Sequence, residues 1–169
     1  PPLTSPPAGP GTGEPQAEPA SNLTRYQRLL WMSQQLAPEA PLLANGGVIR
    51  LPLRIVPEIF ARAFQSVVDG SDALRTVVEE IDGVPSQRVR EGWRCEVDFQ
   101  DLSARPQPLA EARSLAMARC RLPHPISRSL VDVALYKLGE EEFLWYFNLN
   151  HLIADAWAVS LVPRAVSCA

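Results

Sequence analysis

The chain has 169 residues, of which 46% are hydrophobic and 21% are charged, and its formal net charge is -3. This length is sufficient for one domain with a hydrophobic core. The small negative charge gives no electrostatic reason to expect a nucleic acid or an anionic membrane as partner, and no apolar run approaches the ~18 residues of a membrane-spanning helix.

Prolines and glycines crowd residues 1–22, which predicts a disordered Pro/Gly-rich linker there. Such segments join modules in multidomain enzymes and also occur as simple disordered termini, and composition does not decide between the two. The chain lacks an initiator Met and a signal-peptide pattern. We therefore expect a fragment of a longer polypeptide at both ends.

Helical spacing begins after the linker and ends before Pro38, with Thr24 or Asn22 as the expected N-cap. The apolar residues at this spacing are Tyr26, Leu29, Leu30, Met32 and Leu36. Residues 48–55 then predict a strand, which Pro52 restricts to an edge or bulged position. Residues 58–68 predict a second amphipathic helix.

A hairpin is expected next, because Asp82-Gly83 lies between predicted strands over residues 77–81 and 86–89. Such a dipeptide favours the two-residue turn that joins antiparallel strands.

Residues 95–99 predict a short strand, and residues 108–119 a helix capped by Asp101 or Ser103. His124 follows between two prolines, so we expect a loop residue without a catalytic role. A strand is then expected over residues 131–138, and a turn connects it to the most apolar segment of the chain.

Three cysteines, Cys95, Cys120 and Cys168, are an odd number at wide spacings without a Cys-x-x-Cys pair. This pattern argues against a disulfide framework and a zinc site, and it favours a reducing cytoplasm. We expect no metal and no directly bound cofactor.

Residues 143–149 predict a strand in the middle of a sheet, because apolar side chains alternate on both of its faces. Asn150 and His151 follow at its end, and Asp155 precedes a predicted helix. An imidazole at the end of a rigid strand is well placed for proton chemistry. Asp155 would orient the loop or cap the helix. The plainer alternative is that His151 is an ordinary core or surface residue without a catalytic role.

This segment resembles the His-His-x-x-x-Asp-Gly signature of the condensation domains of nonribosomal peptide synthetases, within the chloramphenicol-acetyltransferase-like superfamily. His151 matches the second, catalytic His of that signature, and Asp155 matches its structural Asp. Three positions depart from the pattern. Asn150 replaces the first His, Ala156 replaces the Gly, and Ala158 replaces a common Ser.

Two further segments resemble condensation-domain motifs in the expected order. Residues 26–31 resemble the first motif, a Gln followed by Leu and Trp in the opening helix. Residues 70–76 keep only the Leu-Arg-Thr end of the second motif, with Asp72 in place of Glu. Because buried charges need partners, we expect Arg75 to form a salt bridge between sheet and helix, or else to be a solvated surface residue.

The resemblance implies an α+β fold, a chloramphenicol-acetyltransferase-like sandwich that forms one lobe of a two-lobed domain. Residues 23–169 would be its N-terminal lobe, and the C-terminal lobe would be its partner across a tunnel. The implied reaction is acyl transfer that forms an amide or ester in nonribosomal peptide or hybrid polyketide biosynthesis. Donor and acceptor would be presented as thioesters on the phosphopantetheine arms of acyl or peptidyl carrier proteins.

In this scheme His151 acts as general base or orients the amine and the tetrahedral intermediate. Asp155 holds the loop and pairs with an arginine of the other lobe. Asn150 hydrogen bonds without titrating, and Ala156 disfavours a positive φ. We expect Trp157 to pack in the core near the loop, with a channel-lining role as the alternative.

We expect residues 1–169 alone to be inactive and to expose an apolar patch that favours aggregation or dimerisation. Two other functions fit the departures from the signature. One is a non-catalytic, condensation-like module that recruits carriers as a scaffold. The other is an acyltransferase of the same fold that uses an amine or alcohol acceptor without a carrier.

Overall fold

A four-stranded sheet forms the centre of the computed structural model, which describes residues 21–169. Its strand order is β1-β6-β5-β4, with β6 antiparallel to both neighbours and β4 parallel to β5. The bounds are Ala44–Leu51 for β1, Val97–Asp101 for β4, Val131–Gly139 for β5 and Glu142–Asn150 for β6. The expected edge position of β1 is confirmed, but the strand ends at Leu51, so Pro52 lies beyond it and not inside it.

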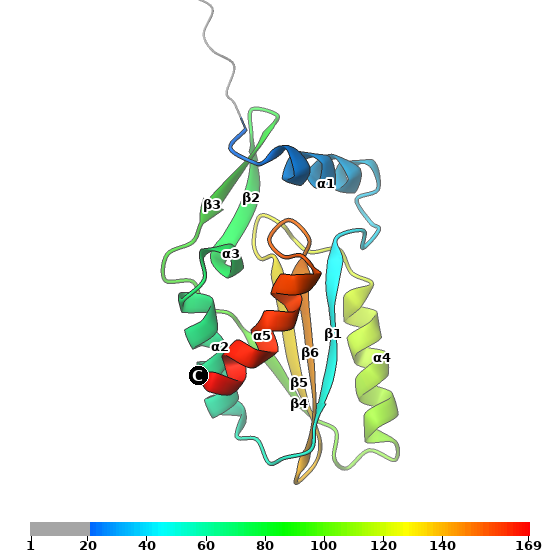
Figure 1. Ribbon diagram of the computed structural model, residues 1–169. Helices are drawn as coiled ribbons and strands as arrows, with labels where there is room; N and C mark the ends of the chain where they lie inside the picture. The colour runs from blue at the N-terminus through cyan, green and yellow to red at the C-terminus, as the bar shows by residue number, and fades with distance from the viewer. Residues whose placement is uncertain (1–20) are drawn as a thin grey trace, which may run out of the picture.

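Helices cover both faces of this sheet (Figure 1). Helix α4 (Pro108–Cys120) packs on one face, and α2 (Pro57–Asp69) and α5 (Ala156–Cys168) pack on the other. A short helix α3 (Asp72–Arg75) leads into a separate hairpin of β2 (Thr76–Ile81) and β3 (Val84–Val89). The result is the expected α+β sandwich.

Strand β6 is the centre of the core, as its sequence predicts. All residues from Phe143 to Asn150 are buried. Trp145 and Phe147 face α2 and α5, whereas Leu144 and Tyr146 face α4. Each large apolar side chain buried in this way contributes about 2 kcal/mol to the stability of the fold.

The predicted turn chemistry is also confirmed. Asp82 and Gly83 have φ angles of 51° and 78°, the positive values that a two-residue hairpin turn requires.

Helix α2 begins at Pro57. Proline suits the first helical position, because a backbone N–H at that position would have no partner within the helix.

Helix α1 (Arg25–Leu36) forms as expected, with a capping box between Thr24 and Gln27. Of its five predicted apolar residues, however, four are exposed to solvent, and Leu30 packs against the core. The exposed residues are Tyr26, Leu29, Met32 and Leu36. The face toward the protein instead carries Trp31 and the buried Gln34, whose amide donates to three backbone carbonyls.

Helix α4 and the predicted linker differ from the sequence-based expectations. Helix α4 begins at Pro108 without the expected side-chain cap, because Asp101 accepts hydrogen bonds from Ser103 instead. Of the predicted linker, residues 1–20 lie outside the described residues, while Ser21 and Asn22 hydrogen bond to β3. Within residues 21–169, no helix has the length and apolar character needed to cross a membrane.

Candidate functional site

Asn150 shapes the turn at the end of β6. Its side chain is 2% exposed, and its Oδ1 accepts a hydrogen bond of 2.9 Å from the N–H of Leu152. Its carbonyl accepts from Ile153 and Ala154, at 3.0 and 3.2 Å. Because the side-chain amide does not titrate, its hydrogen bond with Leu152 does not depend on pH. Asn150 therefore fixes the backbone on which the next residue is carried.

His151 is the first residue beyond β6 and is half-buried. Its backbone N–H donates to the carbonyl of Leu43, at 2.9 Å, which ties the loop to the segment before β1. Its imidazole forms no hydrogen bond to any of residues 21–169, and it lines none of the five best-defined cavities there. His151 thus combines a fixed backbone with an imidazole whose two nitrogens have no partner among the described residues 21–169.

Asp155 closes the loop. Its Oδ1 accepts a hydrogen bond of 2.8 Å from the N–H of Ala158, which makes it the N-cap of α5. Ala156 is the first residue of that helix, so this position needs no positive φ and tolerates a methyl group. Gln27 of α1 supports the loop from outside by donating to the carbonyl of Leu152, at 2.9 Å.

The structure corrects two expectations for this region. Trp157 is 71% exposed and does not pack in the core, because α5 turns Val162 and Val166 inward instead. Arg75 does form a salt bridge, but its partner is Asp72 in the same short helix, at 2.6 Å. It therefore does not join the sheet to a helix through this pair.

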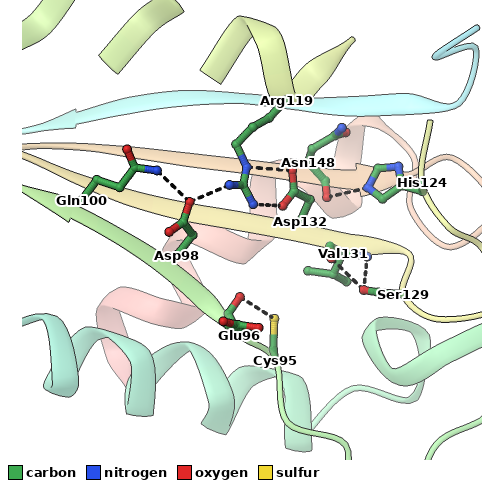
Figure 2. A network of polar contacts seen from close by, with 10 residues as sticks. All are labelled: Cys95, Glu96, Asp98, Gln100, Arg119, His124, Ser129, Val131, Asp132 and Asn148. Carbon is green, nitrogen blue, oxygen red and sulfur yellow. Dashed lines mark hydrogen bonds and ion pairs between the residues drawn. The ribbon is translucent and has the colours of Figure 1, made fainter. Parts of the chain in front are cut away.

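A polar network that the sequence analysis missed lies on the α4 side of the sheet (Figure 2). Arg119 of α4 donates to both carboxylate oxygens of Asp132 on β5 and, at 2.7 Å, to Asp98 on β4. Gln100 also donates to Asp98, at 3.0 Å. These residues lie on three elements that are far apart in the sequence, so no local sequence motif predicts the network.

His124 lies beside this network and contacts β6. Its Nε2 is 3.3 Å from the carbonyl oxygen of Asn148, three residues before His151 (Figure 2). Burial lowers the pKa of His124, against the smaller opposing influences of that carbonyl and of Asp132. The expected loop position is confirmed, and the lowered pKa favours the neutral form of the ring.

Comparison with known proteins gives one consistent family. The model of the family described as "Condensation domain" matches residues 18–167. A linear gramicidin synthase polypeptide of Brevibacillus parabrevis is 27% identical over 82% of this chain, and isonitrile lipopeptide synthase of Streptomyces coeruleorubidus is 29% identical over 86%. The chain spans only 2% and 10% of the lengths of these two curated relatives.

Solved structures agree with this result. The starter condensation domain of rhizomide synthetase, solved as a variant with C8-CoA, superposes with a TM-score of 0.80 at 26% identity. That match covers 86% of this chain and 34% of the other. The first condensation domain of the calcium-dependent antibiotic synthetase gives 0.78 at 23% identity, over 87% of this chain and 36% of the other, and so supports the fold.

Proposed function

The chain belongs to the condensation-domain family of nonribosomal peptide synthetases, with the fold of its N-terminal, chloramphenicol-acetyltransferase-like lobe, and on this premise we propose that it supplies His151 to an acyl-transfer site. The donor is an acyl thioester on the phosphopantetheine arm of one carrier protein. The acceptor is an amine carried on a second one. The C-terminal lobe of the same domain closes the site.

The single observation that supports this function best is the state of His151. The N–H of His151 donates to the carbonyl of Leu43 and the N–H of Leu152 donates to Oδ1 of Asn150, so the backbone is fixed here. The imidazole is left without a partner among residues 21–169. A general base needs this combination, because its position must be set before the substrate arrives and its nitrogen must then be available.

The acceptor amine attacks the thioester carbonyl, a C–N bond forms, and the C–S bond breaks. His151 accepts the proton that the amine loses and returns it to the departing thiolate, so that the products are an amide and the free thiol of the donor arm. Asp155 acts indirectly, because its carboxylate holds the start of α5 and thereby the loop.

Asn150 at the position of the first signature His is compatible with this function. Its observed contact, to the N–H of Leu152, requires only a hydrogen-bond acceptor. The proposed role of this position is therefore to shape the loop, and a residue that cannot titrate suffices for it.

The test is amide formation by the full-length protein, supplied with a donor carrier and an acceptor carrier that are both loaded as thioesters. Product that depends on both carriers supports the proposal. Binding of loaded carriers without product would instead indicate the non-catalytic scaffold, and product with a free amine would indicate the carrier-independent acyltransferase. Residues 1–169 alone are expected to give no product, because half of the site would be absent.

A further inference from the structure

The side chain of Gln27 joins three parts of the molecule at the end of the sheet that carries His151. Helix α1, the β2–β3 hairpin and the loop between β6 and α5 all lie at this end (Figure 1). Nε2 of Gln27 donates to the carbonyl of Leu152, at 2.9 Å, and to Oε1 of Gln87 on β3, at 3.0 Å. Its Oε1 accepts from the N–H of Thr24, at 2.9 Å. The amide of Gln27 therefore has a partner for its oxygen and for both of its N–H groups.

These contacts fix the orientation of the Gln27 amide. The N–H of Thr24 can only donate and the carbonyl of Leu152 can only accept, so an amide turned by 180° would lose both hydrogen bonds. Gln87 accepts from the remaining N–H of Gln27 and thereby holds the amide plane. The donor that reaches Leu152 is thus set by two residues outside the loop.

Gln87 is held in turn by Asn22, which pairs with it as a residue of a neighbouring strand would. Oδ1 of Asn22 accepts from the N–H of Gln87 and Nδ2 of Asn22 donates to its carbonyl, both at 2.8 Å. Nε2 of Gln87 also donates to the carbonyl of Asn22, at 3.3 Å. This last contact uses the amide nitrogen of Gln87 and leaves its oxygen as the acceptor for Gln27.

Leu152, which receives the hydrogen bond of Gln27, directly follows His151 and is 3% exposed. Its N–H is bound by Asn150 from within the loop. Among residues 21–169, only Gln27 donates to its carbonyl. A buried carbonyl that loses its partner is unfavourable, so the loop would move to find another donor. The position of His151 therefore depends on a hydrogen bond that comes from α1.

We propose that Gln27 and Gln87 are positioning residues for acyl transfer at His151. This inference rests on the proposed function, because the reaction assigned to His151 is what their contacts would support. Both side chains act through the backbone of Leu152 and exchange no proton, since an amide does not titrate. A displacement of a reacting group by about 1 Å costs on the order of 10²-fold in rate. Loss of these contacts should therefore lower kcat and leave the KM for each carrier unchanged.

The variant Gln27→Glu separates the role of this residue in α1 from its role in the loop. A carboxylate still accepts from the N–H of Thr24 and keeps the capping box, but it cannot donate to Leu152. In the full-length protein with both carriers loaded, kcat should fall by about 10- to 100-fold. The KM for each carrier should stay within about twofold. Gln35→Glu makes the same change at an exposed position of the same helix and should leave kcat unchanged.

The variant Gln87→Met tests whether Gln87 acts through Gln27. It removes the acceptor of the second N–H while the first can still reach Leu152, so kcat should fall by only about threefold. Added to Gln27→Glu, it should cause no further loss, because residues that act through one contact are not additive. Multiplied losses in the double variant would overturn the role of Gln87.

Amide hydrogen exchange in residues 150–154 of the full-length protein gives a measurement that needs no product. Exchange there should be about tenfold faster in Gln27→Glu and unchanged in Gln35→Glu. Unchanged exchange in Gln27→Glu would overturn the inference, as would faster exchange with an unchanged kcat. Absence of product from the unchanged protein would overturn the proposed function and, with it, the kinetic role. The exchange measurement would then still decide whether Gln27 holds the loop.

Discussion

The loop after β6 and the network around Arg119 lie close together on the same sheet but use their hydrogen bonds in opposite ways. In the loop, the side chains of Asn150 and Asp155 both accept from backbone N–H groups, and the ring of His151 accepts from none of residues 21–169. In the network, each nitrogen of the Arg119 guanidinium donates to a carboxylate oxygen of Asp98 or Asp132.

Under the proposed function, the difference separates the proposed reaction site from a structural arrangement. Hydrogen bonds to backbone groups fix the path of the loop and leave one titratable side chain for an external partner. Hydrogen bonds between side chains hold the charged groups of the network against one another. The proposed function therefore rests on the imidazole of His151, which has no partner among residues 21–169, and not on the cluster of charged residues.

The largest effect should come from a residue that supports both regions. Gly46 of β1 pairs with Asn148 of β6, and a Cβ at Gly46 would lie 2.1 Å from the carbonyl oxygen of Phe147. Gly46→Ala should therefore push β1 away from β6 and cost about 3 kcal/mol in urea unfolding. Gly47→Ala is the matched control, because nothing lies within 4 Å of its added methyl group. Equal stability of the two variants would contradict this packing.

Removing the cation of the network should have the next largest effect. Arg119→Met leaves Asp98 and Asp132 on neighbouring strands without their shared partner. The free energy of unfolding should fall by about 2 kcal/mol, and not more, because the Arg119 side chain keeps 30% exposure to solvent. Adding D98N and D132N should recover most of this loss. If the single variant is as stable as the unchanged protein, the network is not structural.

Loss of the helix cap should have a smaller effect. Asp155→Ala removes the acceptor for the N–H of Ala158 and should cost about 1 kcal/mol in thermal or urea unfolding. Asp155→Asn keeps an acceptor and should keep most of this stability. A loss of amide formation in the Asn variant would support the expected pairing of Asp155 with an arginine of the other lobe. Trp157→Ala, at an exposed position, serves as the control and should change stability by less than about 0.5 kcal/mol.

The smallest effect concerns pH. Because burial lowers the pKa of His124, the unfolded chain takes up a proton before the folded chain as the pH falls. The stability that the neutral ring provides is complete above the ordinary pKa of histidine and is lost below it. The decrease in Tm between pH 7.5 and pH 5.5 should therefore be slightly smaller in His124→Gln than in the unchanged protein. An identical decrease would indicate that His124 titrates like an exposed histidine.

Local signals in the sequence predicted most of the elements. Alternating apolar residues identified β6, Asp82-Gly83 identified a hairpin, and Thr24 marked the start of α1. These features depend on residues that are close together in the sequence, so the sequence alone predicts them. The loop after β6 was found for the same reason, because its residues lie within one short segment.

Features that depend on tertiary placement were not predictable. Arg119, Asp98 and Asp132 meet only because α4, β4 and β5 pack together. Trp157 was misplaced because it is one position away from the buried stripe of α5, and one helical residue turns a side chain by about 100°. The apolar face of α1 was misassigned because glutamines that satisfy backbone carbonyls occupy its buried face.

The most direct test of the central claim, that the free ring of His151 does the chemistry, is to measure turnover and stability together in His151→Ala. With both carriers loaded, the rate of amide formation by the full-length protein should fall by about 10²–10⁴-fold. The free energy of unfolding should change by less than about 0.5 kcal/mol, since the imidazole bonds to none of residues 21–169. Unchanged turnover, or a loss of turnover that only follows a loss of folded protein, would contradict the account.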